Sequence, residues 1–277
     1  MDSAPRGLPL LISRLDKDYA GKAGPRPVLR GIDLQVEAGA FITLIGPSGC
    51  GKSTILRLVA GLDRDYSGSI RVGEAPIRGP DLSRGMLFQE HRLFPWLTVR
   101  QNVALGAFHS GLAPAALDAL VRELLERVGL AHAADLFPSQ LSGGMAQRAS
   151  IARTLAGQPR LLLLDEPFSA LDAFNRLALQ LELERLWQRT GITMILVSHD
   201  IEEAAYLSDH IVVLEADPGR IRTVVENPLP RPRDRVSPAF NAIKARLFEA
   251  LHVDTGAPSA VPTDPVPTDP APEEAIP

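Results

Sequence analysis

The segment FITLIGPSGCGKS at 41–53 constrains the fold of this chain more than any other stretch. FITLIG at 41–46 is an apolar run typical of a buried strand, and STILRLVAGL at 53–62 has helical periodicity. The glycine-rich stretch between them matches the G-x-x-x-x-G-K-[ST] pattern of loops that bind phosphate. A strand that leads through such a loop into a helix predicts an α/β fold with a mainly parallel sheet.

Each residue type in this loop has a physical reason to be there. The glycines let the backbone curl around an anion, so that amide N–H groups and a helix N-terminus point at it. Lys52 neutralises the β- and γ-phosphates of a nucleotide, and Ser53 can place its hydroxyl on Mg²⁺. The predicted nucleotide contacts in the loop are Gly46, Pro47, Ser48, Gly49, Cys50, Gly51, Lys52, Ser53 and Thr54.

The run LLLLDE at 161–166 ends in two adjacent carboxylates. Four consecutive leucines indicate a strand buried on both faces, and two carboxylates at its end are costly unless a cation meets them. Magnesium and its bound water meet that need. We therefore expect Asp165 to hold Mg²⁺ and Glu166 to polarise the attacking water as a general base.

A second anion site is predicted at LSGGM, 141–145. Ser142 is a good N-cap, Gly143 and Gly144 expose backbone amides, and a helix follows at 145–156. One ATP cannot readily use two helix N-termini from opposite lobes of a single chain. The segment is therefore expected to complete the nucleotide site of a partner copy, although S-G-G alone would be an ordinary capped helix.

The other patterns place a helical insertion within a series of strands. Helical periodicity dominates from about 93 to 158, where Pro114 suits a first helical turn and Gly129 ends an apolar stripe. The remaining elements are strands at 161–165, 193–198 and 211–215, an edge strand at 222–226, and helices at 173–189 and 237–251. Residues 252–277 hold seven prolines and a tandem VPTDP repeat, which predicts a disordered acidic tail.

The order and spacing of these motifs resemble those of the ATP-binding cassette (ABC) ATPases, over residues 8–230. The resemblance implies a phosphate-loop NTPase core with an N-terminal antiparallel β portion and the helical lobe inserted at about 93–158. Residues 231–251 would be an appended amphipathic helical segment. It also implies that the nucleotide is ATP, bound with Mg²⁺ between two copies of the chain arranged head to tail.

Four further site residues are implied by the same resemblance. Tyr19 matches the aromatic residue that stacks on adenine, and Gln89 the glutamine that contacts Mg²⁺ and the attacking water. Asp172, in SALD, matches a residue that contacts the opposite subunit, and His199 the histidine that contacts the γ-phosphate. One position departs from the family, because Met145 stands where the signature usually has glutamine; we expect activity to survive, since the phosphate contacts fall to Ser142 and the glycine amides.

Composition points to a cytoplasmic protein. Hydrophobic residues make up 45% and charged residues 22% of the chain, and no apolar run approaches the roughly 20 residues of a membrane span. The N-terminus does not have the pattern of a secretory signal, and the single cysteine forms no internal disulfide. Without its five C-terminal acids the chain carries 28 acids against 29 bases, so nothing favours nucleic acid as a partner.

The segment HRLFPWLTVRQNV at 91–103 resembles importers for nitrate, sulfonates and taurine. That resemblance implies separate integral membrane permease subunits, with Phe94, Pro95 and Trp96 as candidate contacts, and an extracytoplasmic solute-binding protein that acts indirectly. It implies a peripheral position at the cytoplasmic face of the membrane. Trp96 would equally suit the core of the helical lobe.

Two other hypotheses stay open from sequence alone. The first is a non-transport ABC ATPase that acts on a soluble partner. The second is a monomeric phosphate-loop kinase, in which the LSGG segment would be accidental.

Overall fold

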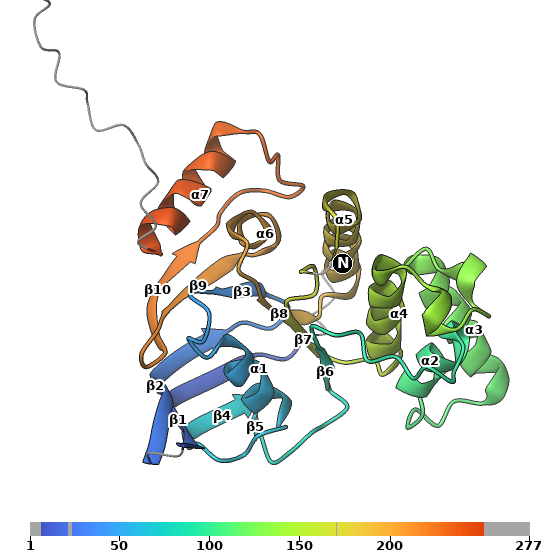
Figure 1. The fold of residues 1–277 in the computed structure, drawn as a ribbon, viewed down its shortest axis with the longest axis horizontal. Coiled ribbons are helices and arrows are strands. Elements are labelled where there is room, and N and C mark those ends of the chain that lie inside the picture. Colours follow the sequence, from blue (N-terminus) through green and yellow to red (C-terminus); the bar gives the residue numbers. More distant parts are fainter. Residues whose placement is uncertain (1–6, 22–23, 170, 252–277) are drawn as a thin grey trace, which may run out of the picture.

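Two β-sheets with a helix between them form the body of the protein, and a lobe of helices lies beside them (Figure 1). The computed structural model describes residues 7–21, 24–169 and 171–251. The predicted tail at 252–277 lies outside the described residues. In the part of the chain that is described, no helix is long and apolar enough to cross a bilayer.

The larger sheet has six strands in the order β10-β9-β3-β8-β7-β6. All neighbouring pairs run parallel except β9 and β10, which confirms the expected edge strand. The phosphate-loop strand β3 lies between β8 and β9, and β8 separates it from β7. The strands are β3 (Phe41–Ile45), β6 (Arg84–Leu87), β7 (Leu161–Asp165), β8 (Thr193–Val197), β9 (His210–Glu215) and β10 (Arg220–Glu226).

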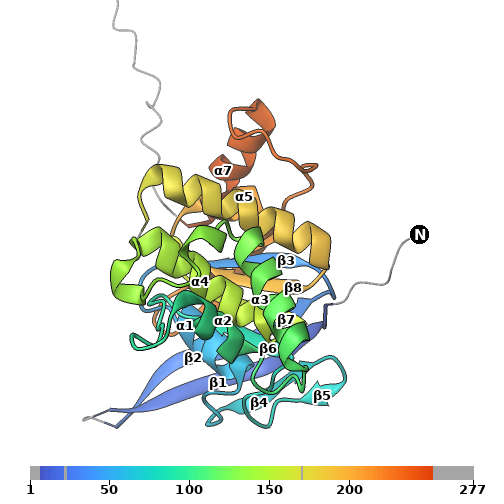
Figure 2. The same cartoon turned by 90° about the vertical axis from the view of Figure 1, so that its right-hand side faces the viewer.

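Both faces of this sheet are covered, as continuous apolar strands require. α1 (Lys52–Ala60) packs on one face, with a core that includes Ile42, Leu163 and Ile195. α5 (Ala173–Thr190) and α6 (Ile201–Leu207) pack on the other face, against the alternate residues of the same strands. Figure 2 shows α5 above the larger sheet and the smaller sheet below it. The carboxyl ends of β3, β7 and β8 therefore meet at one edge of the layered body.

The smaller sheet is antiparallel, with the order β2-β1-β4-β5. It covers α1 from the side opposite the larger sheet, so α1 is enclosed between the two sheets. This is the expected N-terminal antiparallel β portion, and the fold class is confirmed. Its strands are β1 (Leu10–Gly21), β2 (Gly24–Val36), β4 (Ser67–Val72) and β5 (Ala75–Pro76).

The helical lobe has its own apolar core, built from the buried faces of α2, α3 and α4. Thr98 caps α2 (Val99–Gly106) with a capping box, and Pro114 occupies the first position of α3 (Pro114–Arg127). Two short 3₁₀ turns, η1 (Ala131–Ala133) and η2 (Pro138–Gln140), lead to α4 (Gly143–Ala156). The lobe is therefore a separately packed unit.

A helix α7 (Pro238–Ala250) packs beside α6 and β10. Ser237 caps it by accepting a hydrogen bond from the Phe240 amide at 3.2 Å. Two arginines hold the preceding segment to the body. Arg231 pairs with Glu184 at 3.2 Å, and the buried Arg233 donates to the Tyr206 carbonyl oxygen at 2.8 Å.

Candidate nucleotide site

A cleft of about 580 Å³ opens where β3 runs into α1. The backbone there needs glycine at two positions. Gly46 has φ +153°, and a Cβ on it would lie 2.5 Å from the Leu214 carbonyl oxygen; Gly51, just before α1, has φ +95°. The residues that line the cleft are Val28, Ser48, Gly49, Gly51, Lys52, Ser53, Thr54, Glu166 and His199. The structure thus brings most of the predicted loop together with two residues more than 100 positions away.

Lys52 bends back over its own loop. Its side-chain ammonium donates to the carbonyl oxygens of Gly46, at 2.8 Å, and Pro47, at 2.9 Å. These two bonds hold the Lys52 ammonium at the floor of the cleft, and Lys52 is only 7% exposed there. An anion in the cleft would meet a positive charge together with the amide groups at the start of α1.

Cys50 and Val28 differ from what the sequence alone indicated. Cys50 is completely buried in the core beneath the loop and, among the described residues, it does not line the cleft. Val28 in β2 lines the cleft, although no motif marked it. An apolar residue on an antiparallel strand gives no sequence signal of its position next to a loop.

Asp165 and Ser53 lie against each other at the edge of the cleft. The Ser53 hydroxyl donates to Asp165 Oδ1 at 2.8 Å. Burial raises the pKa of Asp165, although the Ser53 bond opposes that rise, and the charge of Glu166 adds to it. A nearby cation would stabilise the charged form of such a buried carboxylate.

Glu166 and His199 come from neighbouring parallel strands, β7 and β8. Glu166 has φ +45°, a conformation that non-glycine residues rarely adopt, and its amide donates to the Val197 carbonyl oxygen at 3.0 Å. Its carboxylate oxygen Oε2 lies 3.3 Å from His199 Nδ1. The His199 side chain is 66% exposed, so it faces the open cleft.

Gln89 lies two residues beyond β6 and is exposed. In the register of β6 and β7, Leu87 pairs with Leu164, so Gln89 and Glu166 both follow the paired residues by two positions. Gln89 is therefore at the same edge of the sheet as Glu166. Within the described residues it does not line the cleft.

Tyr19 also lies outside the lining of the cleft, among the described residues. Its hydroxyl donates to Asp63 Oδ2 at 3.0 Å, and the buried Lys17 ammonium lies 4.5 Å from the centre of its ring. The side chain is 37% exposed. Two neighbours therefore fix the ring while part of it stays accessible.

The LSGGM segment at 141–145 forms the start of α4, and Ser142 caps this helix as expected. Ser142 accepts a hydrogen bond from the Met145 amide at 3.3 Å, and both Ser142 and Gly143 are exposed. Within the described chain, Ser142, Gly143 and Gly144 are absent from the lining of the cleft. Asp172 is likewise at a helix start, where it caps α5 by accepting from the Asn175 amide at 3.0 Å; that bond lowers the pKa of Asp172.

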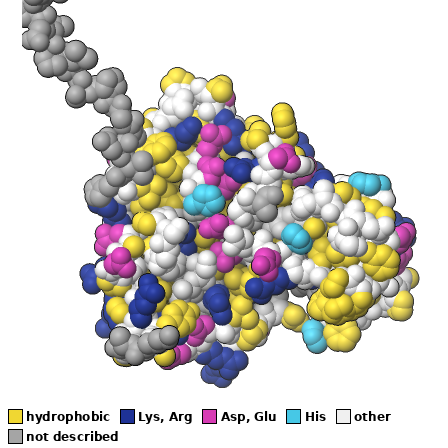
Figure 3. All heavy atoms as spheres, in the orientation of Figure 1, with side chains coloured by type: hydrophobic (Ala, Val, Ile, Leu, Met, Phe, Trp, Pro, Cys, Tyr) yellow, Lys and Arg dark blue, Asp and Glu magenta, His cyan; other side chains and the backbone are white. Residues whose placement is uncertain are grey.

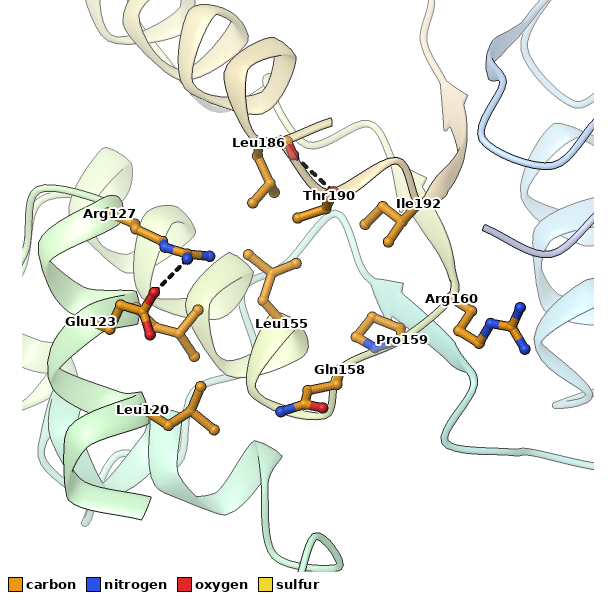
Figure 4. A pocket seen from close by; sticks show the side chains of 11 residues that line it. Leu120, Glu123, Arg127, Leu155, Gln158, Pro159, Arg160, Leu186, Thr190 and Ile192 are labelled. Carbon is orange, nitrogen blue, oxygen red and sulfur yellow. Dashed lines mark hydrogen bonds and ion pairs between the residues drawn. The ribbon is translucent and has the colours of Figure 1, made fainter. Parts of the chain in front are cut away.

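A second cavity of about 610 Å³ lies between the helical lobe and α5 (Figure 4). It is lined by apolar side chains such as Leu155 and Leu186, with an ion pair between Arg127 and Glu123 at its wall. Ile192 lines it just before β8 begins, so it lies at the amino ends of the strands. It is therefore separate from the cleft at the carboxyl ends.

The fold and the cleft together define a phosphate-loop ATPase. The protein-family model for the ABC transporter matches residues 29–169, and the chain belongs to this family. It binds ATP and hydrolyses it.

Several relatives match most of the chain. The aliphatic sulfonates import ATP-binding protein SsuB of Bacillus licheniformis is 50% identical, over 80% of this chain and 86% of its own length. SsuB 1 of Xanthomonas axonopodis pv. citri is 51% identical, over 87% of this chain and 97% of its own. The dimeric post-hydrolysis structure of the ATP-binding cassette MJ0796, bound to ADP and Pi, has a TM-score of 0.72 and 28% identity; 80% of this chain and all of that chain are covered.

Proposed function

We propose that this chain is the ATP-hydrolysing subunit of an importer for a small solute of the aliphatic sulfonate type, acting as a head-to-tail homodimer. The observation that carries the proposal is the cleft in which Lys52, Ser53, Glu166 and His199 meet. The names of the sulfonate import relatives support the cargo class. Taurine and nitrate are the other solutes that the segment at 91–103 brings into consideration.

The residues of the cleft fit Mg²⁺. Ser53 and Asp165 offer two hard oxygen ligands that already touch at 2.8 Å, and phosphate oxygens would supply others. The raised pKa of Asp165 is the property expected of a carboxylate that a cation would stabilise. When bound, the ion neutralises charge on the β- and γ-phosphates. Gln89, at the same edge, is the third proposed contact.

The remaining roles follow from position. Lys52 and the loop amides bind the phosphates, with Thr54 at the start of α1. Glu166 accepts a proton from the attacking water. His199, whose Nδ1 lies 3.3 Å from Glu166 Oε2, holds the Glu166 carboxylate and the γ-phosphate in position for that attack. No reaction intermediate is covalent in this scheme, since positioning and charge supply the catalysis.

The signature helix supports the dimer. Ser142 and Gly143 are exposed at the start of α4 while Gly144 is buried, and in the described chain none of the three lines the cleft. A second copy would bring that helix start to the phosphates, and Asp172 would lie at the boundary between the copies. The dimeric cassette related to this chain supports the arrangement.

Substitution of Tyr19 tests how the nucleotide is bound. We expect Tyr19→Ala to weaken ATP binding about tenfold, because base–aromatic stacking contributes roughly 1–3 kcal/mol. Tyr19→Phe should bind nearly as the native protein does, because it keeps the ring and loses only the bond to Asp63. Titration with a fluorescent ATP analogue measures both variants. Equal affinity for Tyr19→Ala and the native chain would remove Tyr19 from the site.

Substitution of Trp96 tests the proposed contact with the membrane permease subunits. Trp96 is 69% exposed, so of the two alternatives left open by the sequence, burial in the core of the helical lobe is wrong. Its ring lies 5.4 Å from that of Phe94, which makes a small exposed aromatic surface. We expect Trp96→Ser to lower co-purification with the permease subunits at least about fivefold and to leave basal ATPase activity unchanged.

The matched control is Phe108→Ser, which removes another aromatic side chain of the lobe that is 74% exposed. It should leave assembly intact. If the native chain binds no integral membrane protein in mild detergent, transport is contradicted and the second hypothesis, action on a soluble partner, is favoured. With a permease, the chain would lie peripherally at the cytoplasmic face of the membrane, and the extracytoplasmic binding protein would act through the permease.

A further inference from the structure

Arg176, in the first turn of α5, makes one hydrogen bond and lies within ion-pair distance of two carboxylates. Its Nη2 donates to the Leu171 carbonyl oxygen at 3.2 Å. Its Nη1 lies 3.5 Å from Asp200 Oδ2, and its Nε lies 3.8 Å from Glu203 Oε1. Leu171 directly precedes Asp172, whereas Asp200 directly follows His199. One guanidinium therefore joins two loops that are far apart in the sequence.

The loop on the histidine side is held by hydrogen bonds on both sides of His199. The Ser198 hydroxyl donates to Glu203 Oε2 at 2.6 Å, and the Asp200 amide donates to Ser198 Oγ at 3.0 Å. Glu203 is only 6% exposed; its burial raises its pKa, and the charge of Arg176 acts in the opposite direction. A buried carboxylate that loses its cation is costly, so Arg176 stabilises the whole turn.

The loop on the other side is equally well fixed. Leu171 is buried in the core, and Asp172 accepts hydrogen bonds from the Asn175 amide and from Asn175 Nδ2, at 3.0 and 2.6 Å. Residues 171 and 172 therefore move with the start of α5. Arg176 therefore connects this segment to the turn that carries His199.

We infer that Arg176 is a positioning residue that links the Asp172 segment to the His199 loop. The inference rests on the proposed roles of those two residues. Arginine suits this task because its planar guanidinium presents five donors in a fixed geometry, which the point charge of lysine cannot reproduce. Among the described residues, Arg176 does not line the cleft, and the inference places its action through His199.

Arg176→Gln is the first test. We expect kcat for ATP hydrolysis to fall about tenfold or more, because small errors in the placement of a reacting group cost that much. KM and the affinity for a fluorescent ATP analogue should stay within about twofold, because the phosphate contacts are intact. Arg176→Lys keeps the charge and should recover part of kcat, and it also serves if the glutamine variant does not fold.

The matched control is Arg185→Gln on the same helix, where Arg185 pairs with Glu182 at 2.8 Å and is 59% exposed. It should hydrolyse ATP as the native chain does. A native kcat for Arg176→Gln, or a loss of nucleotide affinity equal to its loss of kcat, would overturn the inference.

A double-mutant cycle with His199→Ala separates the inference from the proposed function. If Arg176 acts through His199, the double variant is no slower than His199→Ala alone. If the two effects multiply, Arg176 acts by another route and the inference is wrong. An active His199→Ala variant would overturn the role of His199 and the inference with it, whereas a slow His199→Ala beside an unaffected Arg176→Gln would overturn the inference alone.

Discussion

Glu166→Gln is expected to lower ATP turnover about 10²–10⁴-fold while ATP still binds. Glutamine has the shape of glutamate but cannot accept the proton of the attacking water. The phosphate contacts of Lys52 and the loop are unchanged. The variant should therefore form a dimer that holds ATP without hydrolysing it. Phosphate release measures ATP turnover. Light scattering with and without Mg·ATP measures how much of the chain forms the dimer.

The control for this variant is Glu182→Gln, which removes an exposed carboxylate of α5 that pairs with Arg185. It should hydrolyse ATP normally and should not accumulate as a dimer. If Glu166→Gln kept normal turnover, Glu166 would not be the general base. If it lost turnover but stayed monomeric with ATP, the shared site would be contradicted.

The sequence anticipated those parts of the fold that depend on local pattern. LLLLD at 161–165 forms β7 with the predicted bounds, because a buried parallel strand is a continuous apolar run. The helix expected at 173–189 is α5, which begins at Ala173 after the Asp172 cap and ends before Gly191 in the left-handed conformation. Capping residues and glycines mark element ends directly in the sequence.

The site was harder to anticipate wherever tertiary packing decides. The carboxylate pair after the leucine run marked Glu166, and the family resemblance marked His199, but only the register of β7 with β8 places them 3.3 Å apart. Nothing in the sequence indicated that Val28 lines the cleft or that Cys50 points away from it, and the sequence could not decide between an exposed and a buried Trp96. Arg176 was not among the predicted site residues, because its importance comes from acceptors that the fold brings to it.

The central proposal is that each ATP is shared between two copies, with the phosphate loop of one and the signature helix of the other. Lys52→Ala removes the cation at the floor of the cleft, and Ser142→Arg blocks the exposed start of α4. Each variant alone should be nearly inactive, because both sites of its homodimer carry a defect. In a mixed dimer of the two variants, one site has both defects and the other has none.

The decisive measurement is therefore the ATPase rate of a mixture of Lys52→Ala and Ser142→Arg chains at high protein concentration. The shared site predicts recovered activity, up to roughly a quarter of the native rate, since half of the dimers are mixed and each has one intact site. A chain that carries both substitutions, mixed with an inactive single variant, should recover nothing. If the first mixture stays as inactive as its parents, or if Ser142→Arg alone keeps native activity, the signature helix does not serve the partner's nucleotide and the account is contradicted.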